Sequence, residues 1–194
     1  MDAGTARMMG KRNLSPGPIL YPLPVVMVSC GDRERNVLTV AWAATLCTQP
    51  PVVGIGVRPS RYSHRLLVET GEFVVNIPGE TQMLQADGCG VVSGKDTDKF
   101  ETLGLTPLPA KKVRPPLVAE CPVSLECRVS QRLSLGTHDL FLGEVVEVWA
   151  GEEFLDVGGR IAWEKVSPLV YCDHRYWRLG PQLGEYGFSL RGRR

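Results

Sequence analysis

The chain has 194 residues, which is enough for one domain of ordinary size with a buried core. Its 22 basic and 21 acidic residues leave a formal net charge of +1 at pH 7, so composition gives no support to nucleic-acid binding through a general basic field. No apolar run reaches membrane-spanning length, and no signal peptide is evident. We therefore expect a cytoplasmic protein with no nucleic-acid partner and no membrane partner.

The six cysteines are spread along the chain without a C-x-x-C pair, and none of the three histidines lies in an H-E-x-x-H motif. These spacings predict no zinc site and no other metal centre. Most of the cysteines sit in apolar, strand-like segments, which is typical of buried free thiols in a reducing compartment. Cys47 differs because it lies among polar residues in the candidate site described below.

The sequence predicts a loose leader over residues 1–18, a domain over 19–178 and a solvated, basic tail over 179–194. Within the domain, short segments rich in β-branched residues are separated by proline, glycine or charged turns, which indicates strands. These segments are residues 24–30, 37–47, 52–57 and 72–77. The link over 31–36, GDRERN, is short enough for a hairpin between the first two.

Two further strands are predicted farther along the chain. Apolar and polar residues alternate over 123–129, and the strand over 140–149 contains Gly143, which indicates a bulge or a close approach. The segment over 107–116, PLPAKKVRPP, predicts an ordered connection across the surface.

Three short helices are predicted. The first is capped by Ser60 and ends near Gly71, the second covers residues 80–86, and the third runs from a Thr97 cap to Gly104. Several strands with so few helices indicate a mainly β fold, namely a closed antiparallel barrel with helical decoration.

The most informative stretch is NVLTVAWAATLCTQPP over 36–51, followed by RPSRYS over 58–63. An apolar strand leads into a small polar cluster, TLCT over 45–48, and a second strand leads into a helix start. The first N–H groups of a helix have no partner within the helix and can hold a phosphate, to which Arg61 and Ser63 would add charge-assisted hydrogen bonds. The polar cluster can contact an aromatic ring. The sequence therefore predicts a site for a phosphorylated, ring-bearing cofactor.

Several of these residues also have a plain structural interpretation. Ser60 can simply cap a helix, Trp42 can be a core residue, and Asn36 can satisfy a turn. Asn76 lies within an apolar strand, so its amide needs partners from either the backbone or a cofactor. No G-x-G-x-x-G motif follows a strand, and GCGVVSGKD over 88–96 lacks the spacing of a P-loop.

The chain resembles the flavin reductase-like family of FMN-binding split barrels, and its flavoredoxin branch in particular. Six segments carry the resemblance, in order from about Tyr21 to Tyr171: NVLTVAW (36–42), TQPP (48–51), RYSHRLLVETGEFVVNIP (61–78), SGKDTDKF (93–100), LECRV (125–129) and HDLFLGEV (138–145). The chain departs from the family pattern at Thr137, where many relatives carry aspartate, and in its compact GDRERN turn.

The resemblance implies a Greek-key antiparallel split barrel and a homodimer with FMN near the interface. It implies an oxidoreductase that passes hydride or electrons from NAD(P)H or a redox protein through the flavin. The implied cofactor residues are Asn36, Trp42, Ala43, Ala44, Thr45, Leu46, Cys47, Arg61, Ser63, Asn76, Lys99 and Tyr171. Lys99 could instead form a solvated ion pair with Asp96 or Asp98.

His138 is the implied catalytic residue, because an imidazole near the flavin can stabilise the anionic reduced ring or move a proton. Its structural alternative is a turn histidine between two strands. We assign no role to His64 or His174. The alternative function is a non-catalytic flavin- or haem-binding module for storage or sensing, since one fold hosts several functions.

Overall fold

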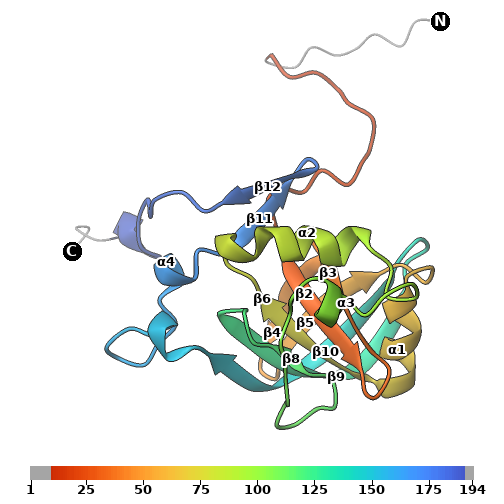
Figure 1. Cartoon of the computed structure of the whole chain (residues 1–194). Coiled ribbons are helices and arrows are strands. Elements are labelled where there is room, and N and C mark those ends of the chain that lie inside the picture. The colour runs from red at the N-terminus through yellow and green to blue at the C-terminus, as the bar shows by residue number, and fades with distance from the viewer. Residues whose placement is uncertain (1–9, 191–194) are drawn as a thin grey trace, which may run out of the picture.

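The computed structural model describes residues 10–190, and its main feature is a strongly curved antiparallel sheet (Figure 1). The order of its seven strands is β3-β2-β6-β9-β10-β5-β4. Their bounds are β2 Val26–Gly31, β3 Arg35–Val40, β4 Ala43–Thr48, β5 Pro51–Val57, β6 Glu72–Ile77, β9 Val123–Ser134 and β10 Asp139–Ala150. The predicted mainly β fold is confirmed, and each predicted strand region contains strand, although one of them is divided in two as described below.

The barrel is split at a seam where β3, one edge of the sheet, lies near β5 without pairing with it. The sequence predicts one strand over 37–47, which is wrong, because the chain leaves β3 at Ala41 and enters β4 at Ala43. The Gly56 N–H donates to the Trp42 carbonyl over 2.7 Å at this turn. β3 and β4 are the two edges of the sheet, so the barrel is not closed by a strand ladder at the seam. Trp42 consequently sits at the seam itself.

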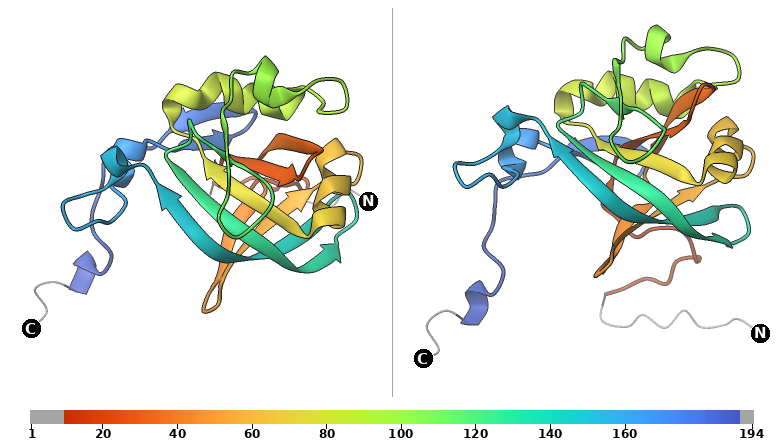
Figure 2. Two further views of the ribbon diagram at one scale, coloured as in Figure 1. Left: turned by 60° about the horizontal axis from the view of Figure 1, so that its bottom comes forward. Right: turned by 90° about the horizontal axis from the view of Figure 1, so that it is seen from below.

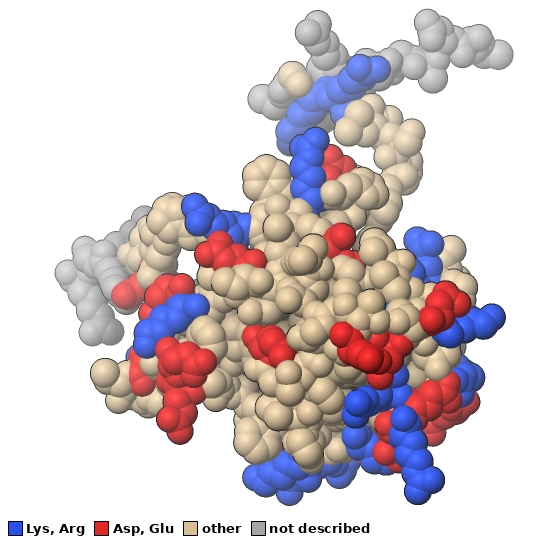
Figure 3. Space-filling view, viewed as in Figure 1, with Lys and Arg blue, Asp and Glu red and all other residues tan. Residues whose placement is uncertain are grey.

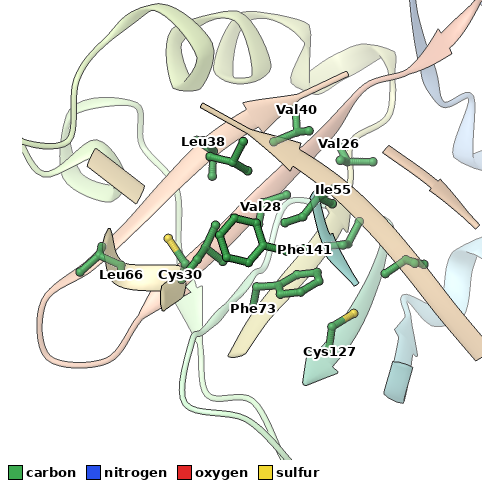
Figure 4. Packing of buried hydrophobic residues seen from close by; sticks show 14 residues of the cluster. Val26, Val28, Cys30, Leu38, Val40, Ile55, Leu66, Phe73, Cys127 and Phe141 are labelled. Carbon is green, nitrogen blue, oxygen red and sulfur yellow. The ribbon is translucent and has the colours of Figure 1, made fainter. Parts of the chain in front are cut away.

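The barrel interior is filled by side chains that point inward from facing strands (Figure 4). Phe73 of β6 and Phe141 of β10 are the largest of them and are fully buried. A Cβ at Gly143 would overlap the Phe73 ring, and the β9–β10 register shifts beside it. The predicted close approach and bulge at Gly143 are therefore confirmed.

Helix α1 (Tyr62–Thr70) packs against the end of the barrel through Leu66 and Leu67. Its N-cap is Arg61 and no side chain caps it, so the predicted Ser60 cap is wrong. Its end is as predicted: Gly71 takes a positive φ of 64° and its N–H donates to the Leu67 carbonyl.

The 3₁₀ turn η1 (Glu80–Gln82) leads into α2 (Met83–Val91), which is longer than the helix predicted over 80–86. Two glycines lie inside α2, and propensity disfavours that. Packing outweighs propensity here, because a Cβ at Gly88 would overlap the Leu103 side chain.

Helix α3 (Lys99–Thr102) is shorter than predicted, and Asp98 rather than Thr97 caps it by accepting from the Phe100 N–H. Together α2 and α3 cover the outer face of β2 and β3, as Figures 1 and 2 show. Ala86 and Cys89 of α2 and Phe100 of α3 form this second core against Met27 and Val37.

The remaining elements are short. The surface connection over 107–116 contains only β7 (Pro107–Leu108), which pairs with β8 (Leu117–Val118). After β10 come η2 (Glu152–Phe154) and α4 (Trp163–Val166). A small sheet that the sequence did not predict joins β1 (Leu23–Pro24), β11 (Leu169–Cys172) and β12 (Arg175–Arg178).

The terminal segments leave the barrel in different directions (Figure 2). Residues 10–18 and 179–190 are exposed. They contain no helix or strand except the turn η3 (Phe188–Leu190). The rest of the predicted leader and tail lies outside the described residues. Among residues 10–190 no helix has the length and apolar character needed to cross a membrane. Acidic and basic side chains alternate over the face in Figure 3 without a large patch of one sign.

Candidate functional site

Three neighbouring hollows run along the seam and share lining residues. The inner hollow, of about 250 Å³, lies between β3, the start of α1 and the segment from α2 to α3. The middle hollow, of about 190 Å³, shares Leu38, Thr39 and Arg61 with it. The outer hollow, of about 390 Å³, shares Trp42, Gly56 and His138 with the middle one. The three form one elongated site from a polar end to an apolar end.

The inner hollow contains the predicted residues Asn36, Ser63 and Lys99 together with Arg61. Asn36 and Ser63 are almost fully buried, and Asn36 Nδ2 donates to Ser63 Oγ over 2.7 Å. A Cβ at Gly94 would overlap the Asn36 amide, so the glycine leaves room for that side chain. The fold thus brings polar residues of β3, α1 and the 93–94 turn together in the inner hollow.

Lys99 is buried rather than solvated, with 3% of its surface exposed. Its Nζ donates to the carbonyls of Val37, over 2.9 Å, and Cys89, over 2.7 Å. The ion pair with Asp96 or Asp98 is therefore wrong. Burial lowers the pKa of Lys99, and the nearby Arg61 charge lowers it further. An ammonium has three N–H donors, so one remains for a ligand in the hollow.

Arg61 stands where the inner and middle hollows meet and is also the N-cap of α1. The first turn of α1 carries no acidic side chain, and no side chain caps it. The Arg61 and His64 N–H groups donate to main-chain carbonyls, and the partial positive charge of the helix start favours an anion, as the guanidinium does.

His138 and Trp42 form the wall between the middle and outer hollows. Their rings stack with centroids 5.7 Å apart and planes 17° apart. Thr137, the departure from the family pattern, pairs its hydroxyl with His138 Nδ1 over 3.0 Å. The other ring nitrogen, Nε2, accepts from Arg58 Nε over 3.3 Å. An acceptor at Nε2 places the proton of the neutral ring on Nδ1, which then donates to Thr137.

The protonation of His138 follows from its surroundings. Partial burial lowers its pKa, and the Arg58 guanidinium lowers it further. The imidazole is therefore neutral at pH 7, and the positive charge beside it belongs to Arg58. Sequence reasoning did not select Arg58, although its position in RPSRYS, three residues before Arg61, was the available signal.

The outer hollow is mainly apolar and contains Ala43, Ala44 and Leu46 of the predicted set. Glycines on the neighbouring strand provide its floor, because a Cβ at Gly54 would overlap the Leu46 side chain. Thr45 and Cys47 lie on β4 with these three residues but line none of the three hollows. Cys47 is an exposed free thiol.

The structure separates Asn76 from the site. Its side chain is fully buried under β8, and the amide is satisfied on both sides by protein atoms. It donates to Met27 O and Ser29 Oγ and accepts from Val118 N and Ser124 Oγ. Asn76 therefore joins elements of the fold, and the assignment of its amide to a cofactor has no geometric support.

Tyr171 also lies outside the three hollows. It belongs to β11, where its ring packs against Tyr21 and Tyr176 and its hydroxyl pairs with His174 Nδ1 over 3.2 Å. In the part of the chain that the structure describes, no group of three or more histidine, cysteine or acidic side chains is placed to hold a metal ion.

Comparison with known proteins is consistent with this geometry. A model of the flavin reductase like domain matches residues 19–180. The flavoredoxin of Desulfovibrio vulgaris (Miyazaki F) has a TM-score of 0.87 with 31% identity, covering 93% of this chain and all of that one. An uncharacterized protein of Archaeoglobus fulgidus is 39% identical over 137 residues, which cover 71% of this chain and 77% of the relative.

The NADH:riboflavin 5'-phosphate oxidoreductase of Streptomyces pristinaespiralis is 28% identical over 136 residues, which cover 68% of this chain and 72% of the relative. The family and the split-barrel fold predicted from sequence are both confirmed. The long match over most of the domain shows that this chain belongs to the flavin reductase-like family of flavin-binding oxidoreductases.

Proposed function

We propose that the chain binds FMN along the seam and works as an FMN-dependent oxidoreductase in the cytoplasm. The observation that carries the proposal is the polarity of the elongated site. Arg61 and Lys99 gather at the inner end, and the outer end is lined by small and apolar side chains. A phosphorylated, tricyclic ligand has this same division between an anionic end and a flat apolar end.

The donor set of the inner hollow suits a phosphate dianion. The Arg61 guanidinium and the remaining N–H of Lys99 supply charge-assisted hydrogen bonds, and the start of α1 supplies main-chain donors. Lys99 is held by two carbonyls and has no carboxylate partner in the described contacts, so its charge is available to an anion. This combination favours FMN over riboflavin.

The outer and middle hollows suit the ring. Trp42 provides a flat aromatic wall that is 44% exposed, and the glycines of β5 leave a smooth floor. When bound, FMN would supply the hydride and electron transfer, while the protein supplies binding, orientation and charge. Arg58 places a positive charge next to His138, where it would favour the anionic form of a reduced ring.

The neutral state of His138 limits its role. Its Nδ1 proton is donated to Thr137 and its Nε2 accepts from Arg58. His138 in this arrangement orients Arg58 and Trp42 and has no free proton to give to a ligand. We propose that Arg58 stabilises charge and that His138 acts as a proton acceptor only when Arg58 turns away.

For the electron source we propose NAD(P)H or a redox protein. The S. pristinaespiralis relative is by its name an NADH-dependent oxidoreductase, which supports the nicotinamide. The D. vulgaris neighbour is a flavoredoxin, which supports electron transfer with a protein partner. We also propose a homodimer, with the exposed edge strand β4 near the interface.

Purified protein tests the proposal. Its absorption spectrum, before and after addition of FMN, is expected to show a bound flavin, and titration is expected to give tighter binding of FMN than of riboflavin. A protein that shows no flavin band and takes up no FMN would contradict the proposal, and a Soret band would indicate haem instead. Steady-state oxidation of NADH and NADPH then separates a reductase from a carrier that only a partner protein reduces.

A further inference from the structure

The strongest feature that the proposed site leaves unexplained is a mostly buried pair beside it. His64 of α1 and Asp139 of β10 meet with Nε2 and Oδ2 2.8 Å apart. Their side chains are 13% and 9% exposed. Asp139 also lies 3.9 Å from Arg132 Nε and is hydrogen-bonded by Ser134. No role was assigned to His64 from the sequence, yet burial of a polar pair requires that both partners be satisfied.

The two residues are direct neighbours of the site. Asp139 is the first residue of β10 and directly follows His138, and His64 follows Ser63 in the first turn of α1. The edge of the His64 ring also packs on Phe141, at 5.4 Å between centroids, so the imidazole is fixed in position. The pair therefore links the helix start that carries the proposed phosphate donors to the start of β10, directly after His138.

The main chain extends this link to Arg58. The His64 N–H donates to the Arg61 carbonyl, and the Arg61 N–H donates to the Arg58 carbonyl, both over 2.9 Å. On the other side, Asp139 pairs in register with Val57, the residue before Arg58. The Arg58–His138 hydrogen bond completes a ring of contacts around the turn from β5 to α1. The His64–Asp139 bond is the second side-chain contact in this ring, and it joins α1 to β10.

A purely structural role would place the pair where the helix needs an anchor. Helix α1 already has one, because Leu66 and Leu67 are 2% and 1% exposed in the barrel core. Those leucines lie two and three residues beyond His64 and anchor α1 in the barrel core, whereas His64 reaches β10 from the first turn itself. The polar pair acts on that first turn, which carries Arg61 and Ser63.

We propose that His64 and Asp139 are positioning residues that hold the first turn of α1 against β10, so that Arg61 and His138 face the same hollow. The inference concerns how the proposed FMN site is assembled, and its flavin readout rests on that proposed function. The chemistry it requires is a donor at position 64 and an acceptor at position 139.

Four variants test the pair. His64→Leu removes the donor, His64→Gln keeps a donor at similar reach, and Asp139→Ala removes the acceptor. The control is Arg114→Leu, which breaks an ion pair of the same 2.8 Å length, to Glu72, away from the three hollows. Dissociation constants for FMN and riboflavin and the thermal midpoint of each variant are measured.

We expect His64→Leu to weaken FMN binding roughly tenfold, as for a misplaced charge-assisted contact, with a smaller effect on riboflavin. His64→Gln should restore most of the loss, and Arg114→Leu should leave FMN binding unchanged. For Asp139→Ala, the direction of the change in FMN affinity separates two explanations. It makes the site more positive, so simple electrostatics predicts tighter FMN binding, whereas positioning predicts weaker binding.

A second readout does not need flavin. NMR titration in the flavin-free protein measures the pKa of His138, which reports whether Arg58 stays beside it. The other charged groups near His138 are Arg61, Arg132 and Asp139. His64→Leu should raise the His138 pKa, whereas Arg114→Leu should not. If the wild type binds no FMN, the proposed function fails and this titration alone judges the pair.

Unchanged FMN binding and unchanged His138 titration in His64→Leu, or tighter FMN binding in Asp139→Ala, would overturn the inference. If His64→Leu does not fold, Asp139→Ala decides the inference alone: weaker FMN binding supports it and tighter or unchanged FMN binding overturns it.

Discussion

Arg58 donates a hydrogen bond from Nε to Nε2 of His138, 3.3 Å away, at the ends of the paired strands β5 and β10. The bond joins the residue that follows β5 to the residue that precedes β10, 80 positions farther along the chain. It fixes the neutral tautomer of His138 and leaves the guanidinium as the charge next to His138, whose ring stacks on Trp42. The predictions below start from this arrangement.

Replacing Arg58 by glutamine should make the potential of the bound flavin more negative. The substitution removes a positive charge that would favour the reduced, anionic ring, and a shift of roughly 30 mV corresponds to a tenfold change for a two-electron couple. Spectroelectrochemical titration of wild type and Arg58→Gln measures it. Lys112→Gln, an exposed cation on the surface connection, is the control. A more positive potential in Arg58→Gln would contradict the charge role.

The stability of the protein should fall as pH decreases from 7 to 5, in part because of His138. Burial and Arg58 lower the pKa of His138 in the folded state, so the unfolded chain binds the proton more readily over this range. The contribution is fully present above the unfolded pKa of about 6.5 and is lost as pH falls below it. Urea unfolding at several pH values measures the slope. It should be smaller in His138→Gln, and an equal slope would exclude His138 as its source.

Lys99→Met should weaken FMN binding by roughly 10–100-fold and riboflavin binding far less, because one charge-assisted hydrogen bond to the phosphate is lost. Lys95→Met is the matched control, since Lys95 is exposed in the same segment and the site does not include it. Fluorescence titration with both flavins measures the dissociation constants, and hence the loss of affinity for FMN relative to that for riboflavin. Equal losses for FMN and riboflavin would show that Lys99 supports the fold rather than the phosphate.

Asn76→Ala should destabilise the protein by roughly 3 kcal/mol, because buried donors and acceptors lose their partners. The affected groups lie on three different elements, at Met27, Val118 and Ser124. Its affinity for FMN should remain that of the wild type under conditions where the variant is folded. Urea unfolding and FMN titration measure the two effects. A loss of affinity without a loss of stability would return Asn76 to the cofactor site.

The sequence by itself determined the strands, the family and most of the site residues. Runs of β-branched residues bounded by turns fixed the main sheet, because a pleated strand favours those side chains at every step. The RPSRYS segment likewise located the polar end of the site. These features are local, so residues close in sequence carry the information.

Tertiary structure decided what depends on contacts between distant segments. The break at Trp42 contains no breaking residue, and its carbonyl accepts from the N–H of Gly56 on another strand. Gly88 lies inside α2 where its lack of a side chain makes room for Leu103. The burial of Lys99 and the satisfaction of Asn76 depend on carbonyls and amides of other elements. The partnership of His64 with Asp139 spans 75 residues. A side chain's partners, protonation and role are set by what folding places beside it, and no local pattern records that.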